Sequence, residues 1–168
     1  IYRQFTDTTF KCLGSHGWID VKNALNQSCN IYFYETGRLL GINRMNDYCT
    51  RFGLGQKTGV EINESSGVLA GIAYREAHGG TWYPGDTVQA AIGQSDNLFT
   101  PIQLCSYVST IANGGTRYRA HFVKSVKSSD YSETLLSNDG VVLNETGVSQ
   151  NSIRIVKEGM GMLGARLP

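Results

Sequence analysis

The chain has 168 residues, a formal net charge of +1 and 40% apolar residues. This length supports one domain with its own core, and charges of both signs are scattered along it, which excludes an electrostatic footprint for nucleic acid or an anionic membrane. No apolar stretch reaches the roughly 18 to 20 residues of a membrane span, and the N-terminus lacks a signal-peptide pattern.

The first two expected elements are helices on either side of a Ser-x-Asn tripeptide. Asp20 is a candidate N-cap for a short helix, whose apolar residues fall on one face: Val21, Ala24 and Leu25. Residues 31–40 predict a second, buried helix that starts with three consecutive aromatic residues and ends near Gly41. The tripeptide Ser28-Cys29-Asn30 therefore lies at a junction between helices.

The middle of the chain has weaker signals. Residues 46–51 predict a short helix, which Phe52-Gly53-Leu54-Gly55 ends. Residues 53–85 are rich in Gly, Ser and Asn without sustained periodicity, so we expect a long irregular connection there. Such loops in compact domains tend to be functional or to wrap a surface.

The strongest helix signal follows. Thr100 is the expected N-cap and Pro101 the first helical residue, and Asn113-Gly114-Gly115 stops the helix. Residues 118–127 alternate in part, and Asn138-Asp139-Gly140 separates two apolar runs, which predicts strands and a hairpin. A last amphipathic helix closes the chain, with Ile153, Val156, Met160 and Leu163 on one face. The expected class is α+β, mostly helical, with residues 1–168 as one unit.

The cysteines and histidines give no metal signature. Cys12, Cys29, Cys49 and Cys105 form no Cys-x-x-Cys pair, and no histidine stands at zinc-ligand spacing from them. We interpret the four as unpaired buried thiols, with a disulfide between Cys12 and Cys29 left open. No metal or cofactor is predicted.

Ordered blocks along the chain resemble the monofunctional, class B penicillin-binding proteins of the PBP2-like kind. The blocks cover nearly the whole sequence and are Phe10-Lys11-Cys12, Gly17, Asp20-Val21, Ala24-Leu25, Ser28-Cys29-Asn30, Tyr32-Phe33-Tyr34, Gly41, Phe52-Gly53-Leu54-Gly55, Thr58-Gly59, Gly85-Asp86-Thr87, Ile92-Gly93-Gln94, Thr100-Pro101-Ile102-Gln103-Leu104, Ala112-Asn113-Gly114-Gly115 and Glu158-Gly159-Met160. The family uses three motifs, Ser-x-x-Lys, Ser-x-Asn and Lys-Thr-Gly. Only the middle one is assigned here.

The resemblance implies roles for two residues. The Ser28 hydroxyl would relay a proton between the catalytic lysine and the leaving group, and Asn30 would hydrogen-bond the acyl-donor peptide. Taken alone, Ser28-Cys29-Asn30 is a weak signal, and a helix cap at Asn30 is the simpler interpretation of it. By the same resemblance, Asp86 and Gln94 are expected to be scaffold residues, and the aromatic run at residues 32–34 is expected to be core.

Two motifs of the family are expected outside this chain. No Ser-x-x-Lys precedes Ser28, and in the family that motif lies several tens of residues upstream. Lys57-Thr58-Gly59 spells the third motif but follows Ser28 too soon, so we interpret it as a structural turn and expect the catalytic copy shortly beyond Pro168. Because the chain also begins at Ile1 and not at methionine, we expect an internal fragment of a longer protein.

The implied fold is the helical part of the serine β-lactamase/D,D-peptidase fold, lacking most of its central antiparallel sheet. The implied parent is a peptidoglycan D,D-transpeptidase that takes stem peptides ending in D-alanyl-D-alanine, binds β-lactams and works with a membrane glycosyltransferase on the extracytoplasmic face of the cell membrane. The fragment itself is expected to be inactive and to expose apolar surface that favours self-association. Alternatives are a β-lactam sensor, a noncatalytic peptide-binding domain of the same fold, or a purely structural module.

Overall fold

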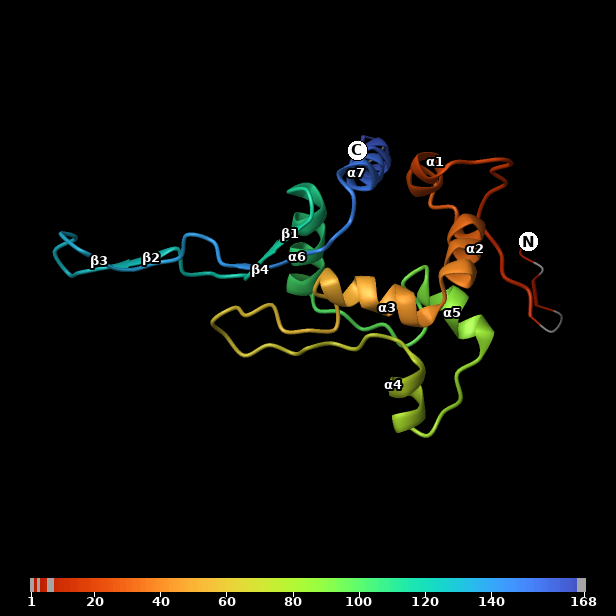
Figure 1. Cartoon of the computed structure of the whole chain (residues 1–168), viewed down its shortest axis with the longest axis horizontal. Coiled ribbons are helices and arrows are strands. Elements are labelled where there is room, and N and C mark those ends of the chain that lie inside the picture. The colour runs from red at the N-terminus through yellow and green to blue at the C-terminus, as the bar shows by residue number, and fades with distance from the viewer. Residues whose placement is uncertain (1, 3, 6–7, 166–168) are drawn as a thin grey trace.

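The computed structural model of the chain describes residues 2, 4, 5 and 8–165 (Figure 1). The helices are α1 (Val21–Asn26), α2 (Asn30–Leu40), α3 (Ile42–Arg51), α4 (Ile72–Ala77), α5 (Pro84–Ala90), α6 (Pro101–Ala112) and α7 (Gln150–Gly164). The strands are β1 (Thr116–Tyr118), β2 (Ser125–Lys127), β3 (Thr134–Ser137) and β4 (Val142–Glu145). The α+β, mostly helical class is confirmed.

Local capping explains the helices that the sequence predicted best. The Asp20 carboxylate accepts a 2.8 Å hydrogen bond from the Asn23 N–H and so starts α1. At α6 the Thr100 hydroxyl and the Gln103 side chain cap each other's backbone N–H groups, and Pro101 holds the first helical position. Both helices begin where the sequence predicted, because these signals lie within four residues of chain.

The prediction for residues 42–90 was partly wrong. Helix α3 begins at Ile42, four residues before the predicted start at residue 46, and the connection predicted as irregular contains α4 and the start of α5. These two helices have 6 and 7 residues. Helices this short are not stable alone in water, so they depend on tertiary packing. They are also too short to produce a periodic pattern that would predict them from the sequence.

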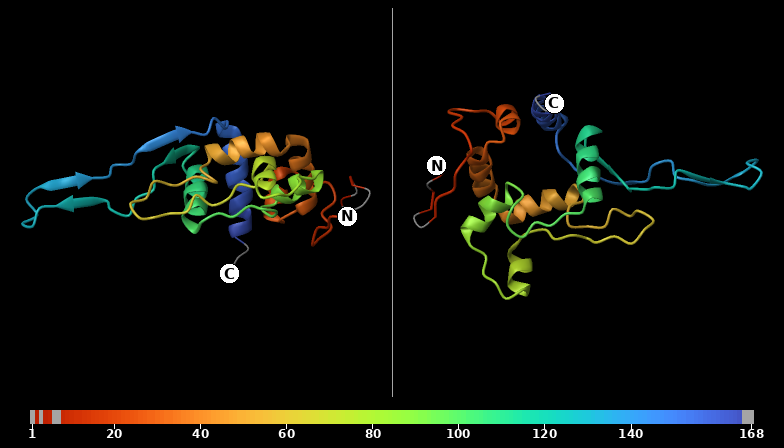
Figure 2. Two further views of the ribbon diagram at one scale, coloured as in Figure 1. Left: turned by 90° about the horizontal axis from the view of Figure 1, so that it is seen from below. Right: turned by 180° about the vertical axis from the view of Figure 1, so that it is seen from behind.

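The hairpin was predicted at the wrong turn. Strand β1 pairs with β4, and β2 pairs with β3, both antiparallel. The turn at Asn138-Asp139-Gly140 therefore joins two different two-stranded sheets and does not close a hairpin, although Gly140 has the positive φ of 86° that such a turn favours. The β2–β3 ribbon extends away from the helices in all three views (Figures 1 and 2).

Two small cores connect the N-terminal segment with α2, α3 and α5. The first joins Tyr2, Phe10, Tyr34 and Val88, which ties the N-terminal segment and α2 to α5. The second joins Ile42, Ala70 and Ala90, which ties α3 to α5. Helix α1 packs against α7 far along the sequence (Figure 1). None of the described helices has both the length and the apolar character needed to cross a membrane.

Large apolar side chains remain exposed on this framework. Leu13 and Trp18 are fully open to solvent, with relative exposures of 103% and 106%. The sheets in the described part of the chain have two strands each. An isolated two-stranded sheet is marginal in water, so the helices carry most of the packing.

Candidate functional site

The Ser28-Cys29-Asn30 tripeptide forms the tight turn between α1 and α2. The Ser28 N–H donates to the Leu25 carbonyl at 3.2 Å, and the Cys29 N–H donates to the Ala24 carbonyl at 2.9 Å. Ser28 is exposed and has a φ of 50°, in the left-handed region that costs a residue with a side chain about 1 kcal/mol. Backbone hydrogen bonds from Ser28 and Cys29 to residues of α1 therefore hold an exposed serine in a strained conformation.

Asn30 is the first residue of α2, not a cap before it. The N-cap is Cys29, which makes no side-chain capping bond. Tyr34, four residues further along α2, has its pKa raised mainly by burial. Because Tyr34 belongs to the first core, the start of α2 is anchored next to Ser28. The core role predicted for Tyr34 is confirmed, whereas Tyr32 and Phe33 are only half-buried and stack edge to face.

Helix α7 packs against α1, the helix that leads into the Ser28 turn. Gly159 is buried against α1, where the Leu25 side chain and the Lys22 carbonyl oxygen approach it. The Lys22 ammonium group also contacts the Glu158 carboxylate at 3.3 Å. The predicted helix around Glu158-Gly159-Met160 is therefore confirmed, and its function in this structure is to position α1.

An open cleft of about 610 Å³ lies beside the turn. Its walls are the loop before α1 and one face of α2, including His16, Trp18, Cys29, Tyr32 and Glu35. Ser28 and Asn30 do not line this cleft. Hydrogen bonds from Arg38 and from the Tyr2 hydroxyl hold the pKa of Glu35 at about 2, so it contributes a carboxylate to the rim.

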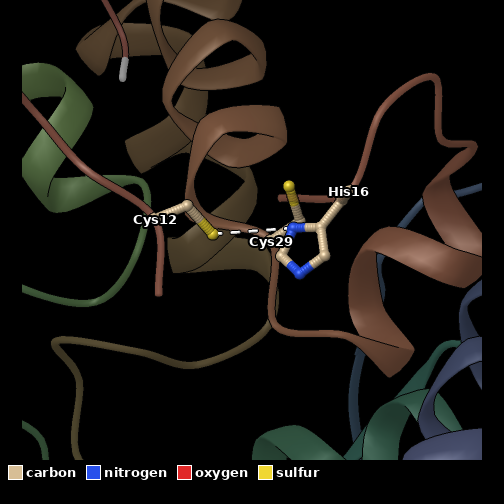
Figure 3. Close-up of side chains that lie close together, drawn as sticks. All are labelled: Cys12, His16 and Cys29. Atoms are coloured by element: carbon tan, nitrogen blue, oxygen red, sulfur yellow. Dashed lines mark hydrogen bonds between the residues drawn. The ribbon is translucent and has the colours of Figure 1, made fainter. Parts of the chain in front are cut away.

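Cys12, His16 and Cys29 meet at the base of this loop (Figure 3). Their donor atoms all lie within 4.8 Å of one another, and Cys12 Sγ is 3.6 Å from His16 Nδ1. Thiols and imidazoles suit soft divalent ions such as zinc, so these three side chains are close enough to share one. Sequence reasoning missed the group, because it searched for Cys-x-x-Cys; the signal in the sequence is Cys12 and His16 four residues apart.

The four cysteines are free, as predicted, but only Cys29 is buried. Cys105 is exposed, and Cys12 and Cys49 are intermediate. Burial raises the pKa of the Cys49 thiol. The expectation of four buried thiols was therefore wrong for three of them.

Lys57-Thr58-Gly59 has the geometry of a structural turn. The Glu64 carboxylate accepts from the Thr58 N–H at 2.9 Å, the Thr58 hydroxyl at 2.8 Å and the Gly59 N–H at 2.7 Å. Lys57 itself is exposed, and Thr58 is buried. The N–H and O–H donors of Thr58 and the N–H of Gly59 are thus all bonded to Glu64 and are not free for a ligand.

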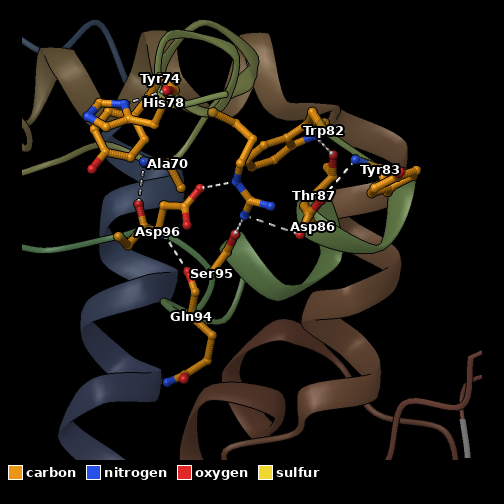
Figure 4. Close-up of polar contacts among 12 residues, drawn as sticks. Ala70, Tyr74, His78, Trp82, Tyr83, Asp86, Thr87, Gln94, Ser95 and Asp96 are labelled. Atoms are coloured by element: carbon orange, nitrogen blue, oxygen red, sulfur yellow. Dashed lines mark hydrogen bonds and ion pairs between the residues drawn. The ribbon is translucent and has the colours of Figure 1, made fainter. Parts of the chain in front are cut away.

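Asp86 belongs to a network around the Arg75 guanidinium (Figure 4). Arg75 contacts Asp96 at 2.6 Å and Asp86 at 3.4 Å, and lies over the Trp82 ring. Asp86 also accepts from the Tyr83 N–H at 2.8 Å, at the start of α5. This is the geometry of a scaffold residue. Gln94 is exposed, and its carbonyl accepts from Asn97.

Comparison with known proteins identifies the class to which this fold and this turn belong. The family model for the penicillin binding protein transpeptidase domain matches residues 3–163, and the chain belongs to that family. Its fold is a partial penicillin-binding transpeptidase fold of the PBP2-like, class B kind.

Individual relatives agree with this assignment. The peptidoglycan D,D-transpeptidase MrdA of Salmonella typhimurium is 33% identical over 115 residues, which are 67% of this chain and 18% of the relative. The penicillin-binding protein 2A of Bacillus subtilis is 30% identical over 164 residues, covering 85% of this chain and 22% of the relative. The crystal structure of Pseudomonas aeruginosa PBP2 superposes with a TM-score of 0.72 at 27% identity, over 90% of this chain and 36% of that one. The chain thus spans about a fifth of these curated relatives.

Proposed function

We propose that this chain is part of a peptidoglycan D,D-transpeptidase that cross-links stem peptides through an acyl-serine intermediate. The observation that carries the proposal is the rigid Ser28-Cys29-Asn30 turn, which presents an exposed serine hydroxyl in a chain of the transpeptidase family. The relatives named peptidoglycan D,D-transpeptidase support the same activity for the parent protein.

In this proposal the chain supplies proton transfer and positioning, and the nucleophile comes from a Ser-x-x-Lys motif elsewhere in the parent. The Ser28 hydroxyl relays a proton between the catalytic lysine and the leaving amine, which a hydroxyl can do because it both donates and accepts. The Asn30 carboxamide hydrogen-bonds the backbone of the acyl-donor peptide. Neither residue forms the covalent bond.

The substrate of the parent is a stem peptide ending in D-alanyl-D-alanine. The nucleophilic serine attacks the penultimate D-alanine carbonyl, the terminal D-alanine leaves, and an amine of a neighbouring peptide takes the acyl group. β-Lactams acylate the same serine. The parent works with a membrane glycosyltransferase on the extracytoplasmic face of the cell membrane, and a solved relative in a peptidoglycan synthase complex supports this partnership.

The chain alone is proposed to be inactive. Its sequence has no Ser-x-x-Lys, and the Lys-Thr-Gly that it does have is held by Glu64 in a turn. The exposed Leu13 and Trp18 support the self-association proposed for the isolated chain.

The test uses the full-length parent and a fluorescent penicillin. We expect Ser28→Ala to slow acylation by roughly 100-fold or more, the range typical of lost acid-base catalysis. Asn30→Ala should also slow acylation, because it removes the hydrogen bond to the acyl donor. Lys57→Ala is the matched control and should acylate at the normal rate. Normal acylation in both Ser28→Ala and Asn30→Ala would overturn the proposal. Acylation without release of D-alanine from a stem pentapeptide would favour a β-lactam sensor or a noncatalytic binding domain instead.

A further inference from the structure

Cys12 and Cys29 are brought together by the fold at the first turn of α2. The two residues are 17 positions apart in sequence, yet their Sγ atoms lie within 4.8 Å of each other (Figure 3). Cys12 follows the segment that Phe10 anchors in the first core, and Cys29 is the N-cap of α2. Both thiols are free. A disulfide would need the two sulfurs to approach from this separation to about 2.05 Å.

The two thiols differ in their surroundings. Cys29 is only 3% exposed, whereas Cys12 is partly open to solvent and faces His16. A partly exposed thiol beside a buried second thiol at the start of a helix is the arrangement of reactive dithiol pairs.

We propose that Cys12 and Cys29 are a redox pair that a disulfide oxidant converts into an intramolecular disulfide. The proposal rests on the distance between the sulfurs, on the difference in exposure and on the helix start. It goes beyond transpeptidation and does not depend on the roles of Ser28 and Asn30.

The chemistry balances with a small-molecule disulfide as oxidant. The Cys12 thiolate attacks one sulfur of the oxidant, breaking its S–S bond and releasing one thiolate, which takes up the Cys12 proton. The Cys29 sulfur then attacks Cys12 Sγ, releases the second thiolate and gives up its own proton. The protein loses two electrons and two protons, and the oxidant gains them as two thiols.

The disulfide would act on the turn that contains Ser28. Cys29 lies between Ser28 and Asn30, and its N–H is bonded to Ala24. A bond from Cys29 to Cys12 would link the turn covalently to the N-terminal segment and close the loop that includes His16 and Trp18. On the extracytoplasmic face proposed above, such a bond would persist, because disulfides are stable in oxidising compartments.

The test uses the full-length protein, freed of metal with a chelator, in buffers of increasing oxidised-to-reduced glutathione ratio. After acid quenching and unfolding, free thiols are alkylated and peptides are mapped by mass spectrometry. We expect Cys12 and Cys29 to lose alkylation together and to appear in one cross-linked peptide. Cys49 and Cys105 are the matched controls and should appear in no cross-linked peptide.

Two variants make the result specific. Cys12→Ser should abolish the cross-link and leave Cys29 fully alkylated, and Cys105→Ser should leave the cross-link unchanged. Retention of both alkylated thiols in the chelated wild-type protein at the most oxidising ratio would overturn the proposal. Glutathione adducts on Cys12 without the cross-link would do the same, because they would show that Cys29 cannot reach Cys12.

Discussion

Gly159 of α7 lies so close to Leu25 of α1 that a Cβ atom at position 159 would be 2.9 Å from Leu25 Cδ1 and 3.0 Å from the Lys22 carbonyl oxygen. The absence of a side chain at this residue is therefore what lets the two helices touch. Since α1 leads directly into Ser28, a contact 131 residues away in sequence (159 − 28) positions the candidate site.

This contact gives the first prediction. Gly159→Ala should destabilise the protein by about 2 kcal/mol, because the added methyl group overpacks a backbone contact that cannot relax. Gly161→Ala in the same helix is the control, since a Cβ there meets nothing within 4 Å, and it should stabilise by up to about 1 kcal/mol through helix propensity. Urea unfolding of both variants measures the two values. Equal effects of the two substitutions would contradict the packing role of Gly159.

A substitution at Gln103 should also destabilise the protein strongly. Its side chain is 1% exposed, its Nε2 donates to the Gln56 and Ser66 carbonyls at 2.5 and 2.7 Å, and its Oε1 accepts from the Thr100 N–H. Gln103→Glu removes both donors and should cost about 3 kcal/mol. Gln150→Glu, at an exposed residue with one 2.8 Å bond to Gly114, should change the free energy of unfolding far less. Comparable losses in the two variants would rule out this account.

The Glu64 carboxylate should make the stability of the protein depend on pH. Although burial opposes the shift, hydrogen bonds from Thr58 and Gly59 lower the pKa of Glu64 below its ordinary value of 4.5. Its stabilising contribution is therefore fully present above about pH 4.5 and is lost as the pH falls through the lowered folded-state pKa.

Glu64→Gln should accordingly be less stable than the parent sequence at neutral pH, and the difference should shrink as the pH falls below that value. Chemical unfolding at a series of pH values measures it, with Glu76→Gln, at an exposed glutamate, as control. A difference that stays constant with pH would contradict a lowered pKa for Glu64.

Two substitutions of Ser28 distinguish the effect of backbone strain on stability from the effect of the hydroxyl on acylation. Because its φ of 50° suits glycine, Ser28→Gly should stabilise the protein by about 1 kcal/mol, whereas Ser28→Ala keeps the strain and should change stability by less than about 0.5 kcal/mol. Both variants lack the hydroxyl and should acylate equally slowly with penicillin. A loss of stability in Ser28→Gly would show that the backbone is not strained there.

The sequence predicted those parts of the fold that nearby residues determine. The helix that starts at Thr100 and Pro101 begins and ends as expected, because the cap, the proline and the stop at Asn113 all act within the helix. The helix at Asp20 and the Ser28-Cys29-Asn30 junction were equally local. For the same reason, the resemblance of ordered motifs indicated the family.

What the sequence did not predict depends on distant partners. Helix α5 begins at Pro84 and is held by Asp86, whose partner Arg75 lies in α4. The turn at Asn138 has hairpin chemistry, but its flanking strands pair with β1 and β2 instead of each other. Cys12 and Cys29 meet only because the N-terminal segment packs on α2, which no spacing rule encodes.

The β2–β3 ribbon is a suitable site for inserting foreign sequence into this protein. Every residue of both strands is exposed, and the ribbon closes at its base where the Asn138 N–H donates to the Lys124 carbonyl at 2.8 Å. Because the chain leaves and returns at adjacent positions, residues 125–137 could be exchanged for an epitope or a short linker without moving the ends that the helices hold. Reporter groups grafted at this ribbon would lie far from α1 and α2, the helices that flank the Ser28 turn (Figure 1).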